Sequence, residues 1–328
     1  MRIAIAVSSL ARVQSTWTTA IIAQELLSAG YELFIVEPSK FEIEPSGRLV
    51  ARGISLSEGS MNDVGGEVSP SSISKAMTSQ STKRCYIQMN TLDVLILRCN
   101  PIEHGLLAFA QLVAMSGVVV ANDPRYLSLA SHKAFLSTVP DVPTPRGLIS
   151  RDPQACLNFF QDKYRGVVVK PARGSGGIGV SLVPAGDKTG LVRSVEAVRG
   201  IGDGYAVVQE YLEAASEGEK RLFFMGGRLV GAYLRERPSG DFRHNLKQGG
   251  IPVGCELDDS DRKIEEALRA HLIGVGAWLA GVDVIGGTVI EVNTLNPGGL
   301  HHINEKTDGG VNFQVAKSIA TWVANRKS

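Results

Sequence analysis

The chain has 328 residues, with 34 Lys and Arg against 33 Asp and Glu, and a formal net charge of +1. This length allows two or three domains with cores of their own. The balanced charge argues against nucleic acid or an anionic membrane as the main partner, and 44% hydrophobic residues are typical of a folded protein. No apolar run approaches the ~18 residues of a membrane span, and the opening MRIAIAV is too short for a signal peptide.

Four cysteines, Cys85, Cys99, Cys156 and Cys255, lie far apart and form no CxxC pair. This usage is typical of a reducing compartment rather than of a disulfide framework or a zinc site. We therefore expect a cytoplasmic protein that is an enzyme or binds a small molecule.

The first 123 residues alternate between strand and helix patterns. In chain order these are residues 3–7, 18–29, 31–36, 92–97, 102–115 and 118–121, beginning with a strand, a helix and a strand and ending with a strand, a helix and a strand. The alternation predicts a parallel sheet with helices on both faces. Residues 46–83 are rich in Ser and Gly and predict a long loop or mobile flap, with a disordered insert as the alternative.

From about residue 124 the pattern changes to α+β, with antiparallel strand pairs. We expect a short helix at 130–136, a proline-containing linker at 140–145, strands at 167–170, 180–183 and 205–211, a hairpin of 220–225 with 228–234, a helix at 264–280, a hairpin at 282–293 and a last helix near 313–323. The predicted domains are residues 1–123, 124–204 and 205–328.

The segment GSGGIG at residues 174–179 is a glycine-rich loop between two predicted strands. It contains GxGxxG, but in a dinucleotide-binding fold that loop opens a helix, and no Lys-Ser or Lys-Thr pair completes a P-loop. Its backbone N–H groups suit a loop that closes over phosphates, and Lys170 would place a positive charge beside it. A glycine-rich hairpin with a surface lysine is the alternative.

Two carboxylates and an amide occur on the hairpin VDVIGGTVIEVN. Glu291 and Asn293 are two residues apart and share a strand face. A two-residue turn would put Asp283 on the opposite face, whereas a three-residue turn at 286–288 pairs Asp283 with Glu291 and leaves Ile290 on the apolar face. We favour the three-residue turn. Paired carboxylates need a cation, and an all-oxygen set suits Mg²⁺ that bridges nucleotide phosphates; a solvated acidic face is the alternative.

A further segment, FRHNLKQGG at residues 242–250, carries Arg243 and Asn245 beside glycine-rich backbone. These groups suit the stabilisation of an oxyanion or an acyl phosphate. By itself the segment is also typical of an ordinary polar loop.

Taken in order, eight blocks resemble the ATP-grasp ligases and, within them, the bacterial-type glutathione synthetases. They are LDVLILRCNP, VVVANDPRYLSLASHKAFL, VVVKPARGSGGIG, QEYL, EGEKR, FRHNLKQGG, GVDVIGG and IEVN, and they extend over nearly the whole chain. The resemblance implies an ATP-grasp fold, α/β and α+β, in which a Rossmann-like N-terminal domain with a parallel sheet precedes two α+β subdomains that sandwich ATP. It also implies a carboxylate–amine ligase that forms an amide through an acyl phosphate and releases ADP and phosphate.

The resemblance assigns roles to the positions that match its motifs. For ATP it implies phosphate contacts from Lys133 and Lys170, a lid from Gly174, Ser175, Gly176 and Gly177, an adenine pocket from Gln209, Glu210, Tyr211 and Leu212, and a ribose contact from Glu219. For two Mg²⁺ ions, with Mn²⁺ as an alternative, it implies the ligands Asp283, Glu291 and Asn293. For the reaction it implies Arg221 on the transferred phosphate and Arg243 and Asn245 on the acyl phosphate.

The substrate positions depart from the family pattern. The loop SSLARVQSTWTT differs from the loop that helps to seat the γ-glutamyl peptide, and Asn296, Pro297, Gly298 and Gly299 replace a Ser-Pro-Thr-type turn. We expect this turn to contact the acceptor amine or its carboxylate through backbone N–H groups. Arg235 and Arg237 are both candidates for one substrate-binding arginine. The adjacent His301 and His302 would point apart on a strand or loop and make a poor metal pair.

The expected substrates are γ-glutamylcysteine and glycine. A ligase of the same mechanism that joins another acid and amine, making dipeptides or modifying peptide ends, is the alternative, and an ATP-binding protein without turnover is a third. The expected partners are a small-molecule acid and amine, with no nucleic acid and no membrane. The family implies a homo-oligomer, a dimer or tetramer.

Overall fold

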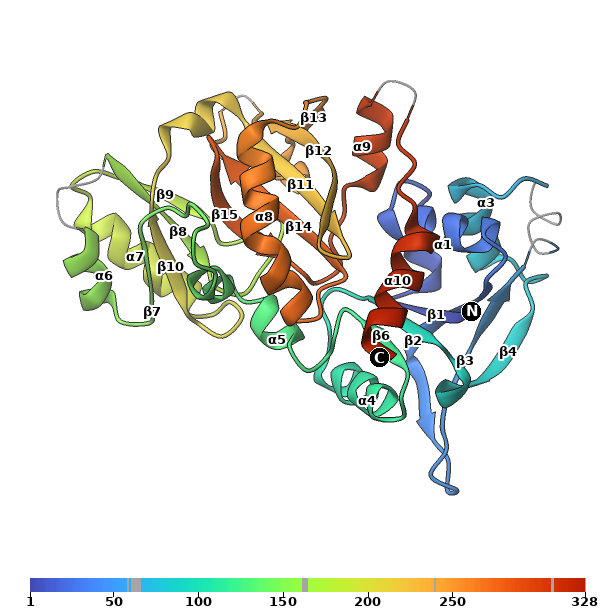
Figure 1. Cartoon of the computed structure of the whole chain (residues 1–328). Coiled ribbons are helices and arrows are strands. Elements are labelled where there is room, and N and C mark those ends of the chain that lie inside the picture. Colours follow the sequence, from blue (N-terminus) through green and yellow to red (C-terminus); the bar gives the residue numbers. More distant parts are fainter. Residues whose placement is uncertain (58, 60–65, 161–164, 239, 308–309, 328) are drawn as a thin grey trace.

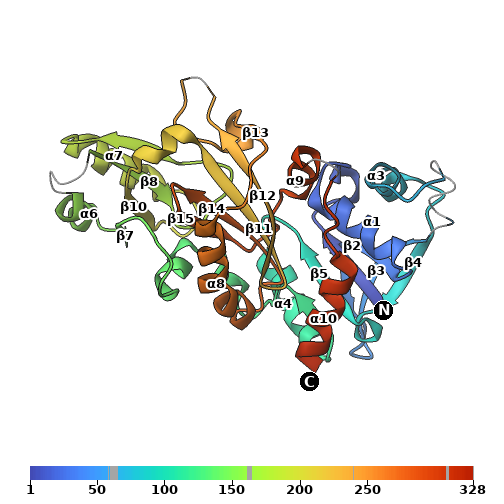
Figure 2. The ribbon, with the colours of Figure 1, turned by 45° about the horizontal axis from the view of Figure 1, so that its top comes forward.

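The strands of the protein form three sheets that follow one another along the chain. The computed structural model describes residues 1–57, 59, 66–160, 165–238, 240–307 and 310–327. In Figures 1 and 2 the third sheet lies between the other two, with the blue N-terminal sheet on one side and the green to yellow second sheet on the other. Within the described ranges, none of the helices combines the length and the apolarity that crossing a membrane would take.

The first sheet is mixed. Its strands, in the order β4-β3-β2-β1-β5-β6, are β1 (Arg2–Val7), β2 (Glu32–Ile43), β3 (Leu49–Leu56), β4 (Arg84–Gln88), β5 (Val94–Arg98) and β6 (Val119–Ala121). The run β2-β1-β5-β6 is parallel, as predicted, whereas β3 pairs antiparallel with β2 and β4 pairs antiparallel with β3.

The prediction of a long loop at residues 46–83 is wrong for much of that segment, which contains β3 and helix α3 (Pro70–Thr78). Ser69 caps α3, Pro70 begins it, and the helix buries Ile73 and Met77 against the sheet. The Ser-rich composition hid a short amphipathic helix whose serines act as cap and first turn. Residues 58 and 60–65 of the segment lie outside the described residues.

Helices cover both faces of the first sheet. Alternate residues of β1 point to opposite sides, so Ile3 and Ile5 pack with helix α1 (Thr18–Ser28) and α3, and Ala4 and Ala6 pack with helix α4 (His104–Met115). This is the doubly wound arrangement that the strand and helix alternation predicts. It leaves the carboxyl ends of β1 and β5 open toward the rest of the molecule.

The second sheet is antiparallel, in the order β7-β10-β8-β9, with β7 (Gly147–Ser150), β8 (Gly166–Pro171), β9 (Ser181–Pro184) and β10 (Ala206–Glu210). Helices α6 (Pro153–Phe160) and α7 (Lys188–Val198), which the sequence reading did not predict, cover the face that carries Val167 and Val169. The opposite face carries Val168 and Lys170.

The third sheet has the order β13-β12-β11-β14-β15, with β11 (Glu219–Met225), β12 (Arg228–Glu236), β13 (Ile251–Val253), β14 (Leu279–Ile285) and β15 (Thr288–Asn293). Helix α8 (Asp259–Gly274) packs on one face. The helix predicted at 264–280 is therefore wrong at its end: Gly276 takes φ +66, and the apolar residues from Leu279 onward belong to a buried strand.

The β14–β15 hairpin pairs Asp283 with Glu291, as predicted, but by a different route. The turn consists of Gly286 and Gly287 alone, and the register shifts at a bulge next to Asp283, because Val284 pairs with Val289. Val289 therefore enters the apolar core, and Ile290 is displaced from it. The expected three-residue turn and the apolar position of Ile290 are both wrong.

The chain ends by returning to its beginning. Helix α9 (Leu300–Lys306) leads to helix α10 (Val315–Lys327), whose Ile319 and Trp322 share one apolar cluster with Ile3 and Ile5 of β1. Figure 1 shows α10, in red, lying between the third sheet and the N-terminal strands. The predicted boundary between residues 204 and 205 cuts the second sheet, because β10 (Ala206–Glu210) lies after it. Helix α10 packs on the sheet of residues 1–123.

Between the first two sheets, the chain forms short helix α5 (Leu127–Ala130) and a 3₁₀ helix (Lys133–Thr138) where one helix was expected at 130–136. Asn122, just before them, ties the first sheet to the third. Its side-chain amide donates to the carbonyls of Leu279 (2.7 Å) and Thr294 (2.6 Å) and accepts from the Leu279 N–H.

Candidate active site

A cleft of about 580 Å³ lies where the three sheets meet, and it contains the whole predicted site. The predicted residues that line it are Lys133, Lys170, Gly174, Ser175, Gly176, Gly177, Gln209, Glu210, Tyr211, Leu212, Glu219, Arg221, Arg235, Arg243, Asn245, Asp283, Glu291, Asn293, Asn296, Gly298 and Gly299. Of the two arginines considered for substrate, Arg235 lines the cleft and Arg237 does not. The structure brings these positions together; their individual roles stay predictions.

Two lysines converge on Glu291. The Lys133 ammonium lies 3.4 Å from Glu291 Oε1 and donates to the Gly174 carbonyl at 3.2 Å. Lys170, on the cleft face of β8, donates to the Ile290 carbonyl at 3.0 Å, so the bulge in β15 presents this carbonyl to it. Burial lowers the pKa of Lys170 to about 8, opposed by the charge of Glu291. Two ammonium groups beside a glycine-rich loop form an anion site.

The glycine loop is already docked against the segment that follows β12. The Gly177 carbonyl accepts from Arg243 Nη1 at 3.2 Å, and the Gly176 carbonyl accepts from Gln248 Nε2 at 3.0 Å. Gly177 has φ +76, and a Cβ there would lie 2.7 Å from Asn245 Oδ1. Only glycine can both adopt this backbone conformation and approach Asn245 so closely.

Asp283 is at the centre of a buried charge network. Arg221, its neighbour on β11, donates from Nη2 to Asp283 Oδ2 at 2.9 Å, and Asn293 donates to the same oxygen at 3.1 Å. Arg235 pairs with both Asp283 and Glu219. Burial alone would raise the pKa of Asp283, but the two arginines outweigh it and hold that pKa below its ordinary value.

The pKa of Glu219 shifts in the opposite direction from that of Asp283. Burial raises its pKa to about 7, against the influence of Arg235. Strand alternation explains why these groups share one face: Glu219 and Arg221 are two apart on β11, and Asp283 pairs with Arg221 across the ladder. The face opposite to them, with Leu222 and its neighbours, packs on α8.

The predicted adenine segment follows β10 at the edge of the cleft. Gln209 is buried, and the Glu210 side chain accepts from the Arg146 N–H at 2.8 Å. The protein backbone thus holds the Glu210 carboxylate, and the adenine role of this segment stays a prediction. The Tyr211 N–H donates to the Gly166 carbonyl at 3.1 Å.

Arg98 is a cleft residue that the sequence reading missed. It ends β5, is 5% exposed, and donates to Thr19 Oγ1 (3.2 Å) and to the Pro297 carbonyl (3.0 Å). Its Nη1 is buried with no hydrogen-bond partner, and burial lowers its pKa to about 9. A buried guanidinium with no carboxylate among the described residues indicates a binding position for an anion. The available signal was an arginine directly after the apolar run VLIL, at the carboxyl end of a parallel strand.

The turn at residues 296–299 is fixed from two sides. Thr18 Oγ1 accepts from the Gly299 N–H at 3.2 Å, and Arg221 Nη1 donates to the Gly298 carbonyl at 3.4 Å. The Gly299 N–H, expected to contact a substrate, is therefore taken by Thr18 in this structure. Asn296 has φ +50, and its buried Oδ1 has no partner. This oxygen is an unused acceptor in the cleft wall.

The two adjacent histidines lie on helix α9 rather than on a strand or loop, and the prediction that they point apart is wrong. Their ring centroids are 5.3 Å apart, and each ring lies 3.9 Å from Glu305 Oε2. His301, His302 and Glu305 thus form a group within the described residues that is compact enough to hold a metal ion. His302 also lines the cleft, and burial lowers its pKa, which favours the neutral ring.

Solved structures with the same three-sheet arrangement define the class of protein. VanG D-Ala:D-Ser ligase from Enterococcus faecalis has a TM-score of 0.65 at 15% identity, covering 98% of this chain and 99% of that one. D-cycloserine synthetase DcsG has a TM-score of 0.64 at 15% identity, over 99% of this chain and 100% of that one. The ATP-grasp ligase PsnB has a TM-score of 0.60 at 18% identity, over 99% of both chains. The fold is that of the ATP-grasp ligases.

Sequence comparison narrows the class to a family. The model described as prokaryotic glutathione synthetase, ATP-grasp domain, matches residues 132–308. The glutathione synthetase of Thermosynechococcus vestitus is 32% identical over 239 residues, 72% of this chain and 73% of that protein, and that of Brucella melitensis is 30% identical over 224 residues, 67% and 70%. The chain belongs to the prokaryotic glutathione synthetase family. It is an ADP-forming carboxylate–amine ligase that uses ATP and a divalent metal.

Proposed function

We propose that this enzyme joins γ-glutamylcysteine to glycine. The observation that carries the proposal is the charge of the cleft: among the described lining residues, seven Lys and Arg face four Asp and Glu. A triphosphate and a peptide carboxylate supply the missing negative charge. The relatives named as glutathione synthetases support the choice of substrates.

The metal-binding residues would be Asp283, Glu291 and Asn293. Asp283 and Glu291 offer carboxylate oxygens and Asn293 offers an amide oxygen, and the three are neighbours across one hairpin, so the donor set fits Mg²⁺. We propose two Mg²⁺ ions, for which Mn²⁺ could substitute. When bound, such ions neutralise the phosphate oxygens. In this structure Arg221 and Arg235 form ion pairs with Asp283, and Lys133 forms one with Glu291.

For the reaction, Lys133 and Lys170 bind phosphate oxygens of ATP while the glycine loop covers them. A substrate carboxylate attacks the γ-phosphorus in line, so that ADP leaves and an acyl phosphate forms. The amine then attacks the acyl carbon, loses a proton, and expels phosphate to leave the amide. Arg243 and Asn245, docked on the glycine loop, stabilise the negative oxygens of both steps. The closed loop excludes water, which would hydrolyse the acyl phosphate.

Arg98 and Asn296 bind the acid substrate away from the reacting centre. The free Nη1 of Arg98 would take a second carboxylate of that substrate, and the free Oδ1 of Asn296 would accept from its amine. Both groups contact or belong to the 296–299 turn, and Arg221 contacts the same turn from the phosphate side. One turn therefore links recognition of the substrate to the reacting end of the cleft.

The second candidate is a ligase of the same mechanism for a different acid and amine, including peptide ends. The unusual first loop and the Asn296 turn favour it, because both border the substrate positions. An ATP-binding protein without turnover fits less well, since lysines, carboxylates and arginines are all present in the cleft. We further propose a homo-oligomer in the cytoplasm, where the four free cysteines would stay reduced.

An ADP-release assay with a panel of acids and amines tests the proposal. Turnover with γ-glutamylcysteine plus glycine, and with no other pair at a comparable rate, is the expected result. No turnover with that pair, together with turnover for another, would establish the second candidate. An absence of ADP release for every pair, in a protein that binds ATP, would leave only the non-catalytic alternative.

A further inference from the structure

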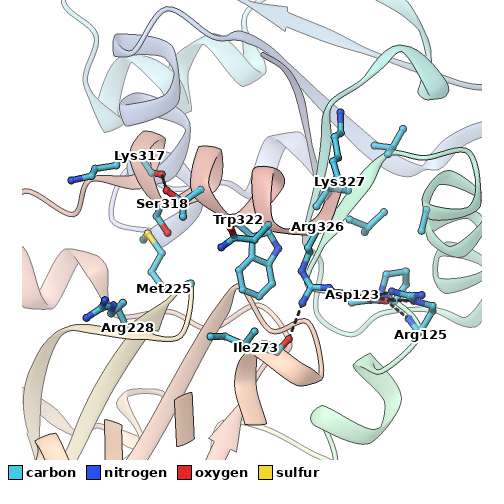
Figure 3. A pocket seen from close by; sticks show the side chains of 18 of the residues that line it. Asp123, Arg125, Met225, Arg228, Ile273, Lys317, Ser318, Trp322, Arg326 and Lys327 are labelled. Atoms are coloured by element: carbon cyan, nitrogen blue, oxygen red, sulfur yellow. Dashed lines mark hydrogen bonds and ion pairs between the residues drawn. The ribbon is translucent and has the colours of Figure 1, made fainter. Parts of the chain in front are cut away.

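A second cavity, of about 1300 Å³, shares none of its lining residues with the active-site cleft. We call it the α8–α10 pocket after two helices that line it. The β11–β12 turn, the end of α4, strand β6 with the segment after it, and residues 312–314 complete its walls. Figure 3 shows the Trp322 ring near its centre, with Arg228 and Lys317 toward one side and Arg326 toward the other. Neither the family roles nor the ligase reaction uses any of these residues.

The pocket is strongly positive, although the whole chain has a net charge of only +1. Six Lys and Arg and one acid line it among the described residues: Arg125, Arg228, Arg269, Lys317, Arg326, Lys327 and Asp123. Asp123 forms ion pairs with Arg125 at 2.6 Å and with Arg326 at 3.8 Å. Lys327 pairs with Asp93 at 3.2 Å. For the other three cations, no acidic partner occurs in the part of the chain that the structure describes.

These three cations surround one tight turn. Arg228 directly follows Gly226 and Gly227, which join β11 to β12. A Cβ on Gly227 would lie 3.4 Å from the Arg269 side chain, and one on Gly226 would lie 3.1 Å from Ser318, the neighbour of Lys317. The turn therefore brings the cations of β12, α8 and α10 into one region. Glu265, which accepts from the Leu229 N–H at 2.9 Å, is the acid beside this turn, and its ion pair is with Arg262. Three cations near one carboxylate leave an excess of positive charge that attracts an anion.

Trp322 supplies an independent indication of a ligand. The side chain is 5% exposed, and its Nε1–H is buried with no hydrogen-bond partner. The Arg326 guanidinium lies 4.3 Å from the ring centroid, and its Nη2 donates to the Ile273 carbonyl at 2.8 Å. A buried indole N–H without an acceptor is unfavourable, and an acceptor atom of a bound molecule would satisfy it.

We propose that the α8–α10 pocket binds a small organic molecule that carries two or more phosphate charges. Its phosphates would lie at Arg228, Arg269 and Lys317, and its organic part would lie against Trp322. Two arginines among three cations favour phosphate, because the guanidinium fork matches its oxygens. The volume exceeds the about 300–1,000 Å³ of ordinary ligand pockets and leaves room for a body of nucleotide size.

The test measures binding to the full-length variant K133M/K170M, in which the active-site cleft has lost both lysines that lie beside its glycine loop and Glu291. The variants below are made in this background for binding and in the unmodified chain for activity. Pyrophosphate and ADP are titrated separately, followed by calorimetry and by tryptophan fluorescence. We expect one equivalent of each probe to bind to K133M/K170M, and we expect ADP binding to change the fluorescence in a way that Trp322→Phe abolishes. Trp322→Phe should weaken ADP binding several-fold more than pyrophosphate binding, because pyrophosphate has no organic part to reach the indole.

A charge-matched pair of variants tests whether Arg228, Arg269 and Lys317 bind the phosphates. The triple variant R228E/R269E/K317E should weaken both probes by about tenfold or more. The control K188E/R193E/K263E makes the same change of charge at exposed positions outside the pocket and should bind as K133M/K170M alone does. All six positions are exposed, so the variants should fold and keep ligase activity, which circular dichroism and ADP release check.

Three results would overturn the proposal. The first is no binding of either probe to K133M/K170M. The second is equal weakening in the pocket variant and in its control, which would show an effect of net charge alone. The third is a change in oligomeric state, measured by light scattering, in the pocket variant but not in the control, which would make the pocket an interface between copies of this chain.

Discussion

Replacing Arg98 by Met tests whether a buried cation is kept for the substrate at a cost in stability. Burial lowers the Arg98 pKa from 12.5 to about 9. At about 1.4 kcal/mol per pKa step, this corresponds to about 5 kcal/mol against the charged form. Removing the guanidinium also leaves the Pro297 carbonyl and Thr19 Oγ1 without their donor, which costs about 1–3 kcal/mol. We therefore expect Arg98→Met to raise the free energy of unfolding by about 2–4 kcal/mol.

Activity should change in the opposite direction. A hydrogen bond to a charged group contributes about 1.5–3 kcal/mol, so the KM for the acid substrate should rise by about 10- to 150-fold. The KM for ATP should stay unchanged, because Arg98 lies on the first sheet, away from Lys133 and Lys170. Chemical denaturation measures the first effect, and ADP release against acid concentration measures the second.

Arg98→Lys is the matched control. It keeps the buried positive charge but loses the planar fork. Arg98→Lys should therefore show little of the stability gain expected for Arg98→Met, and it should keep only part of the affinity for the acid substrate. The reasoning would be refuted if Arg98→Met lowered the stability of the protein. It would also be refuted if the KM for the acid stayed the same.

Three further variants test the cleft. Asp283→Asn should reduce turnover by about a thousandfold and destabilise the fold by about 3–5 kcal/mol, because Arg221 loses its buried counter-ion; normal turnover would exclude a metal role. The Lys170 ammonium is charged below its pKa of about 8 and neutral above it, so ATP affinity should fall about tenfold from pH 7 to pH 9 and stay level in Lys170→Arg. Gly177→Ala should lower kcat about tenfold or more by displacing Asn245, whereas Gly186→Ala, with the same positive φ and nothing within 4 Å, should cost only about 1 kcal/mol of stability.

Most of the cleft residues were predicted from the resemblance to the ATP-grasp ligases, and strand periodicity by itself predicted only a few of them. Alternate residues of a strand share a face, so Glu291 and Asn293 had to point the same way. Asp283 joins them through a bulge, not through the three-residue turn that the apolar consistency of the hairpin favoured. The glycine loop and Lys170 followed from the same reasoning, because a strand on each side fixes where the loop lies. These are local rules, and they work wherever the chain follows a regular ladder.

What the sequence could not predict depends on contacts between distant segments. The bulge beside Asp283 keeps Asp283 paired with Glu291 but places Val289 in the core instead of Ile290. Only the packing of the hairpin against α8 selects Val289 over Ile290. In the sequence, Arg98 is only the residue that ends an apolar strand. That it has no carboxylate partner among the described residues is visible only in the folded structure. Helices α6 and α7 have short apolar stripes, and their burial depends on a sheet whose strands lie before and after them in the chain.

Because α10 lies in the same apolar cluster as β1, the order of synthesis matters for how this protein matures. The second sheet and its two helices, contained within residues 147–210, can assemble soon after they leave the ribosome. The first sheet can pack with α1 and α3 early, but the part of its apolar cluster that Ile319 and Trp322 complete stays open until these residues emerge. Cells would need to shield the amino-terminal segment longest, and a stalled or shortened chain would expose it to aggregation or proteolysis.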